Sequence, residues 1–353
     1  MALSETTGQA TVEGRPATPI QRAIERIRTA LAPVRSRFAL LAVDTRLIGM
    51  IAALAIIWVA FNIAGHGSFL TARNLWNLSV QSASIAIMAT GMVLIIVSRN
   101  IDLSVGSVLA ASAVAALLAS TLPGWGWLGV PFALAVGLVF GAINGGLISF
   151  LRLPPFIVTL GAMTAVRGVA RLIGNDTTIF NPQLPFAFIG NGTVLGVPWL
   201  VIIAVAVIAL SWFILRRTVL GMRIYSVGGN PEAARLSGIN VRAIQLFVYA
   251  ASGLLAGLGA VMSAARLYAA NGLQLGQSYE LDAIAAVILG GTSFVGGVGS
   301  IVGTLIGALI IAVLTNGLVL LGVSDIWQYI IKGLVIIGAV ALDRYRQRDS
   351  ART

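Results

Sequence analysis

The chain has 353 residues, of which 58% are hydrophobic and only 10% are charged, and it contains no cysteine and a single histidine. Soluble domains carry roughly 25% charged residues, so the composition excludes an ordinary soluble protein, and disulfide, thiolate-metal and histidine-metal chemistry have little support. The net charge of +11 comes from basic residues in polar segments between apolar runs. Anionic lipid and membrane topology account for this charge, so no nucleic acid partner is expected.

Residues 1–46 form a polar, basic segment that precedes any apolar run of membrane length. Within it, Ile20, Ile24, Ile27 and Leu31 recur at helical spacing, which is typical of an amphipathic helix lying on the inner leaflet of a membrane. A disordered cytoplasmic tail explains the same composition equally well. The sequence leaves both interpretations open.

Apolar runs dominate the rest of the chain. Three stretches contain no Asp, Glu, Lys or Arg, namely 103–151, 177–215 and 283–324. Because about 20 apolar residues in a helix cross the hydrocarbon core, each stretch has room for about two spans. Taken in chain order, the runs predict an all-α polytopic membrane protein with about ten transmembrane helices, at residues 47–64, 79–97, 104–121, 128–150, 156–173, 198–215, 244–268, 280–295, 300–321 and 326–342.

The basic residues predict the orientation of these helices. With both termini in the cytoplasm, most of the 23 Lys and Arg residues fall on cytoplasmic segments, as the positive-inside rule requires. We therefore expect a cytoplasmic tail at 1–46, a transmembrane domain at 47–342 with a cytoplasmic loop at 216–243, and a cytoplasmic tail at 343–353. The loop carries five basic residues, Arg216, Arg217, Arg223, Arg235 and Arg242.

The two halves of the chain resemble each other weakly. Asn144-Gly145 and Asn316-Gly317 stand at the same distance before a glycine of the following span. In the predicted topology the corresponding helices run in opposite directions, which is what an inverted repeat of spans 2–5 and 7–10 would produce. Chance matches are easy in glycine-rich apolar sequence, so the repeat is a hypothesis.

Polar or glycine-rich breaks interrupt the apolar runs at 100–104 and 290–297. Non-helical backbone at membrane depth is tolerated only where protein or a watery cavity satisfies it, so these breaks predict a translocation path. A charge inside a span is costly unless it is paired or reaches the surface; Lys332 could pair with Asp102 or Asp282, or snorkel outward. The candidate path residues are Asn100, Asp102, Ser104, Ser107, Asn144, Glu280, Asp282, Asn316 and Lys332.

The loop between the sixth and seventh spans contains a short helix with clear ends. Asn230 suits the N-cap, Pro231 the first helical position and Glu232 the positive end of the helix dipole. Arg235 suits the negative end, and Gly238 can close the helix in a left-handed conformation. A loop that only joins two spans needs no such element, so we interpret it as a docking site for a partner, with an inert surface helix as the alternative.

Three segments that follow one another along the chain, 100–107, 228–240 and 279–293, resemble the permease subunit of the ribose-type ABC monosaccharide importers, and the similarity runs from about residue 66 to 342. The resemblance implies a bacterial inner-membrane protein, a second permease subunit, an ATPase pair in the cytoplasm and an extracytoplasmic sugar-binding protein. It also implies that the 228–240 motif is a coupling helix that contacts the ATPase. The residues expected in this contact are Gly228, Gly229, Asn230, Pro231, Glu232, Ala233, Ala234, Arg235, Leu236, Ser237 and Gly238.

A phosphate-binding P-loop needs G-x-x-x-x-G-K-[ST], whereas the only lysine, Lys332, lies within a span. The chain is therefore expected to hold no cofactor and not to be an enzyme itself, with ATP and Mg²⁺ bound by the partner ATPase. The outer loop 174–197 is a candidate contact for the binding protein, or a simple connector.

Other functions fit less well. An ion-coupled symporter needs buried carboxylates, whereas those of this chain cluster at span ends. An intramembrane enzyme needs a catalytic cluster, and no nucleophile elbow or metal motif is present. Within the ABC importers, a permease for branched-chain amino acids or nucleosides is the alternative, because substrate choice resides largely in the separate binding protein.

Overall fold

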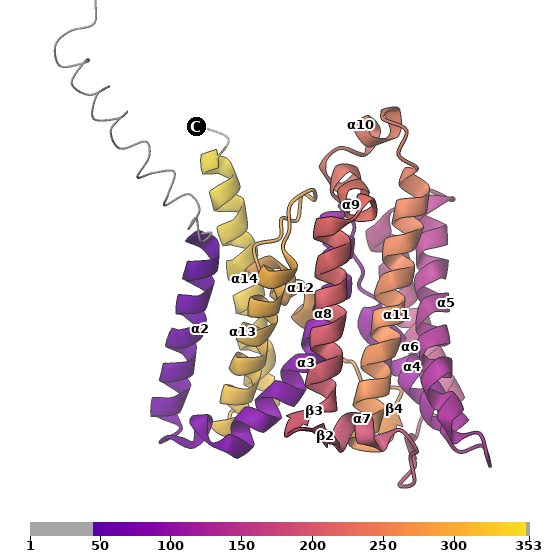
Figure 1. Ribbon diagram of the computed structural model, residues 1–353, viewed down its shortest axis with the longest axis vertical. Coiled ribbons are helices and arrows are strands. Elements are labelled where there is room, and N and C mark those ends of the chain that lie inside the picture. Colours follow the sequence, from indigo (N-terminus) through magenta and orange to yellow (C-terminus); the bar gives the residue numbers. More distant parts are fainter. Residues whose placement is uncertain (1–44, 351–353) are drawn as a thin grey trace, which may run out of the picture. The chain divides into compact units, whose positions relative to one another are not determined.

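The computed structural model of the protein describes residues 45–350, and the predicted N-terminal tail lies outside these residues up to position 44. Within the described part, each of the ten predicted helices has a counterpart (Figure 1). These helices are α2 (Thr45–Ala64), α3 (Ala72–Val97), α4 (Val105–Ser120), α5 (Gly129–Ser149), α6 (Pro155–Ile173), α8 (Trp199–Arg217), α11 (Val241–Leu267), α12 (Tyr279–Leu289), α13 (Ile301–Leu320) and α14 (Asp325–Ser350).

Among residues 45–350, seven helices are long and apolar enough to cross a membrane, and α4 is a shorter apolar helix of 16 residues. α12 has only 11 residues. These helices, with only four short strands among residues 45–350, indicate an all-α, multi-pass membrane protein.

Three helix boundaries differ from the prediction by more than three residues. α3 begins at Ala72 rather than 79, because the polar residues of its first turns are accommodated: the Thr71 side chain caps it and Asn74 is buried. α12 ends at Leu289 rather than 295, since Gly291 has a φ of 80° that a helix cannot continue through. α14 runs to Ser350, so the predicted C-terminal tail from 343 is helical over most of its length.

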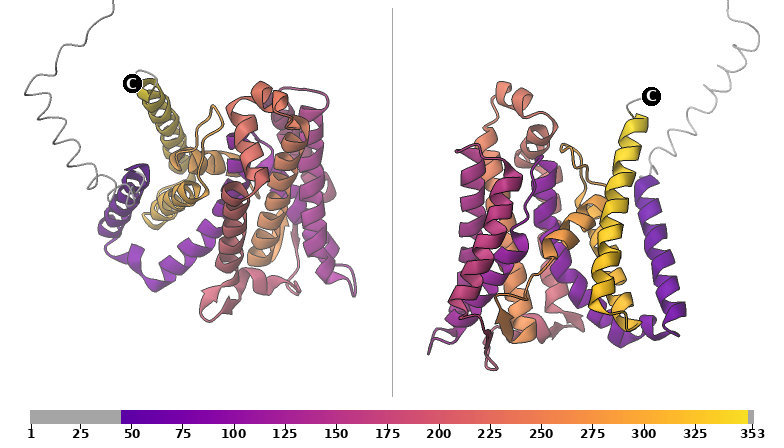
Figure 2. Two further views of the ribbon diagram at one scale, coloured as in Figure 1. Left: turned by 45° about the horizontal axis from the view of Figure 1, so that its top comes forward. Right: turned by 180° about the vertical axis from the view of Figure 1, so that it is seen from behind.

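Short elements connect the long helices. They are α7 (Ala187–Asn191), α9 (Val219–Gly229), α10 (Pro231–Leu236), the 3₁₀ turns Ser68–Leu70 and Gly126–Leu128, and the strands β1 (Thr178–Phe180), β2 (Thr193–Val194), β3 (Val197–Pro198) and β4 (Ala269–Asn271). β1 pairs antiparallel with β4, and β2 with β3. Figures 1 and 2 show α9 and α10 at one end of the helix bundle and the strands at the opposite end.

Close glycine contacts hold the core together. Two glycines spaced four residues apart on α5 face two such glycines on α11: a Cβ on Gly137 would stand 2.9 Å from the Gly257 nitrogen, and a Cβ on Gly141 would stand 3.0 Å from the Gly253 Cα. Lipid is as apolar as leucine, so van der Waals contact of this kind is what associates helices in a membrane. α11 also packs on α3 and α4, while α13 and α12 pack on α3.

Candidate functional site

The loop between α8 and α11 contains the predicted short helix. α10 begins with Pro231 at its first position. The Asn230 side-chain oxygen accepts hydrogen bonds from the backbone N–H groups of Glu232 and Ala233, at 3.1 and 3.0 Å. Asn230 is therefore the N-cap, as predicted, and Glu232 complements the positive end of the helix dipole.

The other end of α10 is closed by a Schellman motif. Gly238 has a φ of 82°. Its N–H donates to the carbonyl of Arg235, and the N–H of Ile239 donates to the carbonyl of Ala234, both at 3.0 Å. Only glycine adopts this φ at little cost, so the predicted closing role of Gly238 is confirmed.

The surface of α10 is free to contact a partner. Glu232 and Arg235 form an exposed ion pair at 2.5 Å, and the hydrogen bond and charge of Arg235 lower the pKa of Glu232. An exposed pair of this kind contributes little to stability. Leu236 is 76% exposed, so α10 offers both charge and apolar surface beyond its own packing.

α9 attaches α10 to two other parts of the chain through Gly228. A Cβ on Gly228 would stand 2.8 Å from the carbonyl carbon of Val97 and 2.7 Å from the nitrogen of Gly297, with the Val97 oxygen closer still. The N–H of Gly297 in turn donates to the Val97 oxygen at 2.9 Å. The ends of α9 and α3 and the glycine-rich segment after α12 therefore meet at one point, which we call the backbone joint (Gly228, Val97 and Gly297).

Two further contacts surround the backbone joint. The Tyr225 hydroxyl on α9 donates to the carbonyl of Gly299 at 2.9 Å. A Cβ on Gly296, whose φ is 88°, would stand 2.7 Å from the Arg99 Cβ. The glycine cluster is recognisable in the sequence as a break, whereas neither α9 nor its contact with that cluster was predicted.

In the segment between α3 and α4, the carboxylate of Asp102 is buried and both of its oxygens accept hydrogen bonds. Asp102, only 3% exposed, accepts from the backbone N–H and hydroxyl of Ser104 at 2.9 and 2.6 Å. Asn144 on α5 donates to the Ser104 hydroxyl at 2.8 Å, and Ser252 on α11 donates to the second Asp102 oxygen at 3.5 Å. Three of the predicted path residues therefore form one cluster, and Ser252 is an addition that sequence reasoning missed.

The backbone of this break is also held by side chains. The carbonyl of Ile101 accepts from the Tyr249 hydroxyl at 2.8 Å and from the Thr159 hydroxyl at 3.5 Å. Asn100 donates to the carbonyl and hydroxyl of Ser98 at 2.9 and 3.0 Å. Tyr249 is fully buried in the apolar α11, and a lone tyrosine there carried no signal that it satisfies a carbonyl of another segment.

The N-terminal ends of α4 and α12 contact each other. A Cβ on Gly106 of α4 would stand 2.5 Å from a carboxylate oxygen of Glu280 in the first turn of α12. With Asp102 just before α4, each helix has a carboxylate at its positive dipole end. We call this contact the α4–α12 junction.

Lys332 on α14 pairs with Asp282 on α12. The ammonium donates to the carboxylate at 2.9 Å, and the two side chains are 18% and 9% exposed. Of the interpretations of Lys332, the pairing with Asp282 is confirmed, whereas the pairing with Asp102 and the outward snorkelling are wrong. A cation of this depth is compatible with a membrane helix because its partner lies on the neighbouring helix.

The remaining candidates lie elsewhere. Asn316 on α13 accepts from Asn74 on α3 at 2.9 Å, and Asn74 also donates to the carbonyl of Phe69 at 2.9 Å. Ser107 is buried, and its hydroxyl has no hydrogen-bond partner among residues 45–350. The role of these residues in a translocation path stays a prediction.

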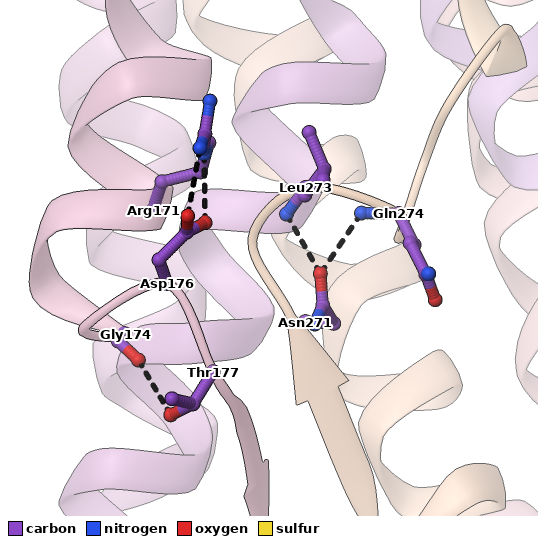
Figure 3. A network of polar contacts seen from close by, with 7 residues as sticks. All are labelled: Arg171, Gly174, Asp176, Thr177, Asn271, Leu273 and Gln274. Carbon is purple, nitrogen blue, oxygen red and sulfur yellow. Dashed lines mark hydrogen bonds and ion pairs between the residues drawn. The ribbon is translucent and has the colours of Figure 1, made fainter.

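The opposite end of the bundle is shaped by short polar turns, shown in Figure 3. Arg171 donates two hydrogen bonds to Asp176, at 2.8 and 2.7 Å, and thereby lowers the pKa of that carboxyl. The Asn271 side chain accepts from the N–H groups of Leu273 and Gln274. These turns flank the β1–β4 pair.

Arg167 on α6 holds the segment that leads to α12. Its guanidinium donates to the carbonyls of Gly272, Leu275 and Gly276, at 3.1, 2.6 and 3.3 Å. No role was predicted for Arg167. The signal was present, however, because a charged side chain in an apolar helix requires a partner.

Comparison with known proteins points to transport. Residues 74–340 match the family described as branched-chain amino acid transport system permease component. The ribose import permease protein RbsC of Escherichia coli is 44% identical over 303 residues, covering 84% of this chain and 93% of that protein. The protein of the same name from Bacillus subtilis is 44% identical over 78% of this chain and 86% of that protein. The xylose transport system permease protein XylH of Escherichia coli is 35% identical over 85% of this chain and 92% of that protein. No solved structure matches the chain significantly.

Proposed function

Because the chain belongs to the branched-chain amino acid transport system permease family, we propose that it is the transmembrane permease subunit of an ABC importer that translocates ribose or a related monosaccharide. The observation that carries this proposal is the 44% identity to ribose import permeases over most of the chain. The lower identity to the xylose permease, 35%, favours ribose over xylose. Within the family description, a branched-chain amino acid is the competing substrate.

ATP hydrolysis belongs to a partner chain. A P-loop needs a lysine that reaches the phosphates, whereas Lys332, the single lysine of the sequence, is ion-paired with Asp282. We therefore propose that ATP and Mg²⁺ are bound by a separate ABC ATPase. α10 is the element that suits its docking, because it is capped at both ends and exposed.

The backbone joint supplies a route for coupling. When the ATPase subunits close and move α10, α9 moves with it, and Gly228 contacts both Val97 and Gly297. The displacement then reaches the end of α3 and the segment between α12 and α13, which changes the side to which the path is open. The contacting backbones form a continuous physical link, and variants of the joint test whether that link carries the displacement.

The proposal includes a membrane topology for the helices. The chain crosses the bacterial inner membrane ten times with both termini and α10 in the cytoplasm, and α3–α6 and α11–α14 form an inverted repeat. In this repeat α3 corresponds to α11, α4 to α12, α5 to α13 and α6 to α14. Packing supports it, because the contact of α5 with α11 has its counterpart in the contact of α13 with α3. Likewise, α4 contacts α5 and α6, and α12 contacts α13 and α14. α4 and α12, the two shortest of these helices, occupy corresponding positions, which is typical of the substrate path in inverted-repeat transporters.

The path therefore passes the α4–α12 junction. Asp102, Ser104 and Asn144 line up there on one side, and Glu280 on the other. Their oxygen and amide groups suit brief contacts with sugar hydroxyls. A second permease subunit completes the path, and the extracytoplasmic binding protein delivers the sugar at the end that carries β1 and β4.

The proposal is tested by uncoupling. In proteoliposomes with the ATPase and binding protein, Glu232→Lys and Gly238→Pro should raise the number of ATP molecules hydrolysed per ribose imported, with normal membrane insertion. Arg223→Glu reverses an exposed charge of the same loop outside α10, so it is the matched control and should leave this ratio unchanged. An unchanged ratio in the α10 variants would contradict the coupling role, and a binding protein that captures leucine instead of ribose would contradict the substrate.

A further inference from the structure

A groove of about 640 Å³ lies beside α10, between the α5–α6 connection and the start of α11. We call it the basic groove. Its lining includes three arginines and one acidic residue from three separate parts of the chain, together with Ser149 and Pro155: Ser149, Arg152, Pro155, Glu232, Arg235 and Arg242.

The positive charge of the basic groove is only partly neutralised. The carboxylate of Glu232 is ion-paired with Arg235 and neutralises that arginine. Arg152 and Arg242 have no hydrogen-bond or ion-pair partner among residues 45–350. The N-terminal ends of α6 and α11, at Pro155 and Val241, also line the groove, and helix N-termini favour anions. Two free guanidinium groups and two helix dipoles therefore point to an anionic ligand.

A buried hydroxyl independently indicates a ligand. Ser149 is 2% exposed and lines the groove. Its Oγ has no hydrogen-bond partner within the described part of the chain. Buried polar atoms are almost always hydrogen-bonded, so this hydroxyl is expected to donate to a group that occupies the groove.

The surroundings favour the phosphate of a lipid. Phe150, Leu151 and Leu153 on the α5–α6 connection, and Phe156 and Ile157 at the start of α6, are all more than one third exposed. In a multi-pass membrane protein such side chains contact acyl chains. The basic groove thus places free arginines next to a surface suited to lipid tails, which is how basic pockets recognise anionic headgroups on the cytoplasmic side.

We propose that the basic groove binds a phosphate group, supplied by an anionic phospholipid of the cytoplasmic leaflet, through Arg152, Arg242 and Ser149. Arginine matches this ligand because its planar guanidinium donates two parallel hydrogen bonds to phosphate oxygens. Since α10 forms one wall, a lipid held here also supports the position of the docking helix.

The test is lipid retention by the purified full-length chain. The protein is equilibrated in nanodiscs of phosphatidylcholine with a minor fraction of phosphatidylglycerol, and the phosphatidylglycerol that stays bound after transfer to detergent is counted by native mass spectrometry. Arg152→Gln/Arg242→Gln should reduce retention at least about tenfold, and Ser149→Ala by about threefold. Arg223→Gln, an exposed arginine of α9 outside the groove, is the matched control and should retain as much as the unmodified chain.

Two further arms make the test decisive. Raising the salt concentration should weaken retention by the unmodified chain, which tests the charge without any variant. Titration with inorganic phosphate separates a lipid phosphate from a free phosphate. If the unmodified chain binds free phosphate, the double variant does not, and phosphatidylglycerol is not enriched, the phosphate site is supported. Its ligand is then a soluble anion instead of a lipid. Equal retention by the double variant and Arg223→Gln would overturn the proposal. So would weaker ATPase association in the double variant with unchanged phosphatidylglycerol, because the groove would then bind a partner carboxylate.

Discussion

Gly228→Ala is the sharpest test of the backbone joint. The added Cβ would stand 2.7 Å from the Gly297 nitrogen and 2.8 Å from the Val97 carbonyl carbon. Non-bonded heavy atoms of this kind rest at about 3.5–4.0 Å, so the backbones must separate by roughly 1 Å. All the close atoms belong to backbone, so no side chain can rotate away to make room.

The cost of that separation follows from two terms. Overpacking of a well-packed contact typically costs about 1–3 kcal/mol. Separation also lengthens the 2.9 Å hydrogen bond from Gly297 to Val97, whose loss adds about 1 kcal/mol. A total of about 2–4 kcal/mol shifts the equilibrium against the intact joint by roughly 30- to 700-fold. Movements of α10 should then no longer reach α3 and the segment before α13.

Gly229→Ala is the matched control, because Gly229 is the next residue of α9 and a Cβ there meets nothing within 4 Å. Both variants are reconstituted with the ATPase and binding protein, and ribose uptake and ATP hydrolysis are measured on the same vesicles. Gly228→Ala should lose most of its uptake while it still binds the ATPase, and Gly229→Ala should keep both activities. Equal uptake by the two variants would refute the reasoning.

Three other substitutions probe the remaining contacts. Lys332→Leu leaves the buried Asp282 unpaired and should lower the free energy of unfolding by about 3–5 kcal/mol, seen as a lower unfolding temperature in detergent; the double variant with Asp282→Leu should regain much of this, and an unchanged temperature in the single variant would contradict the ion pair. Asn230→Ala should destabilise α10 by about 1 kcal/mol and speed amide hydrogen exchange across it, whereas Asn230→Asp keeps the cap; identical exchange in both would contradict the N-cap. Asn144→Leu removes the donor to Ser104 and should cost about 1–3 kcal/mol, with reduced uptake at normal membrane levels; wild-type uptake would show that this cluster is not needed.

The fold could be predicted largely because charge and apolarity are local signals. Runs such as 128–150 and 300–321 lie within a residue of α5 and α13, since a membrane helix must be apolar throughout its length. The prediction failed where tertiary contacts override the local signal. The polar start of α3 continues as helix because Asn74 is bonded to Asn316 on α13, a pairing that no local pattern of polar residues reveals.

In the candidate site, too, local features were predictable from the sequence and tertiary contacts were not. The caps of α10 were predictable, because Asn230, Pro231 and Gly238 act on backbone groups a few residues away. The backbone joint was not predictable, since Gly228 and Val97 are far apart in sequence and glycine is frequent in every apolar segment of this chain. The cost of a buried charge left three interpretations of Lys332, namely a pair with Asp102, a pair with Asp282 or outward snorkelling, and only the arrangement of α12 and α14 decides among them.

The carboxylates near the α4–α12 junction indicate how transport is energised. An ion-coupled symporter needs a carboxylate that is free to exchange H⁺ or Na⁺. Both oxygens of Asp102 are instead hydrogen-bonded, to Ser104 and Ser252, and Asp282 is paired with Lys332. Since Asp102 and Asp282 hold helix ends in place, their geometry favours the proposed entry of energy through α10 over ion coupling at these two acids. Vesicles with the full complex should therefore accumulate ribose with ATP in the presence of a protonophore, and uphill accumulation by vesicles that contain this chain alone would contradict the argument.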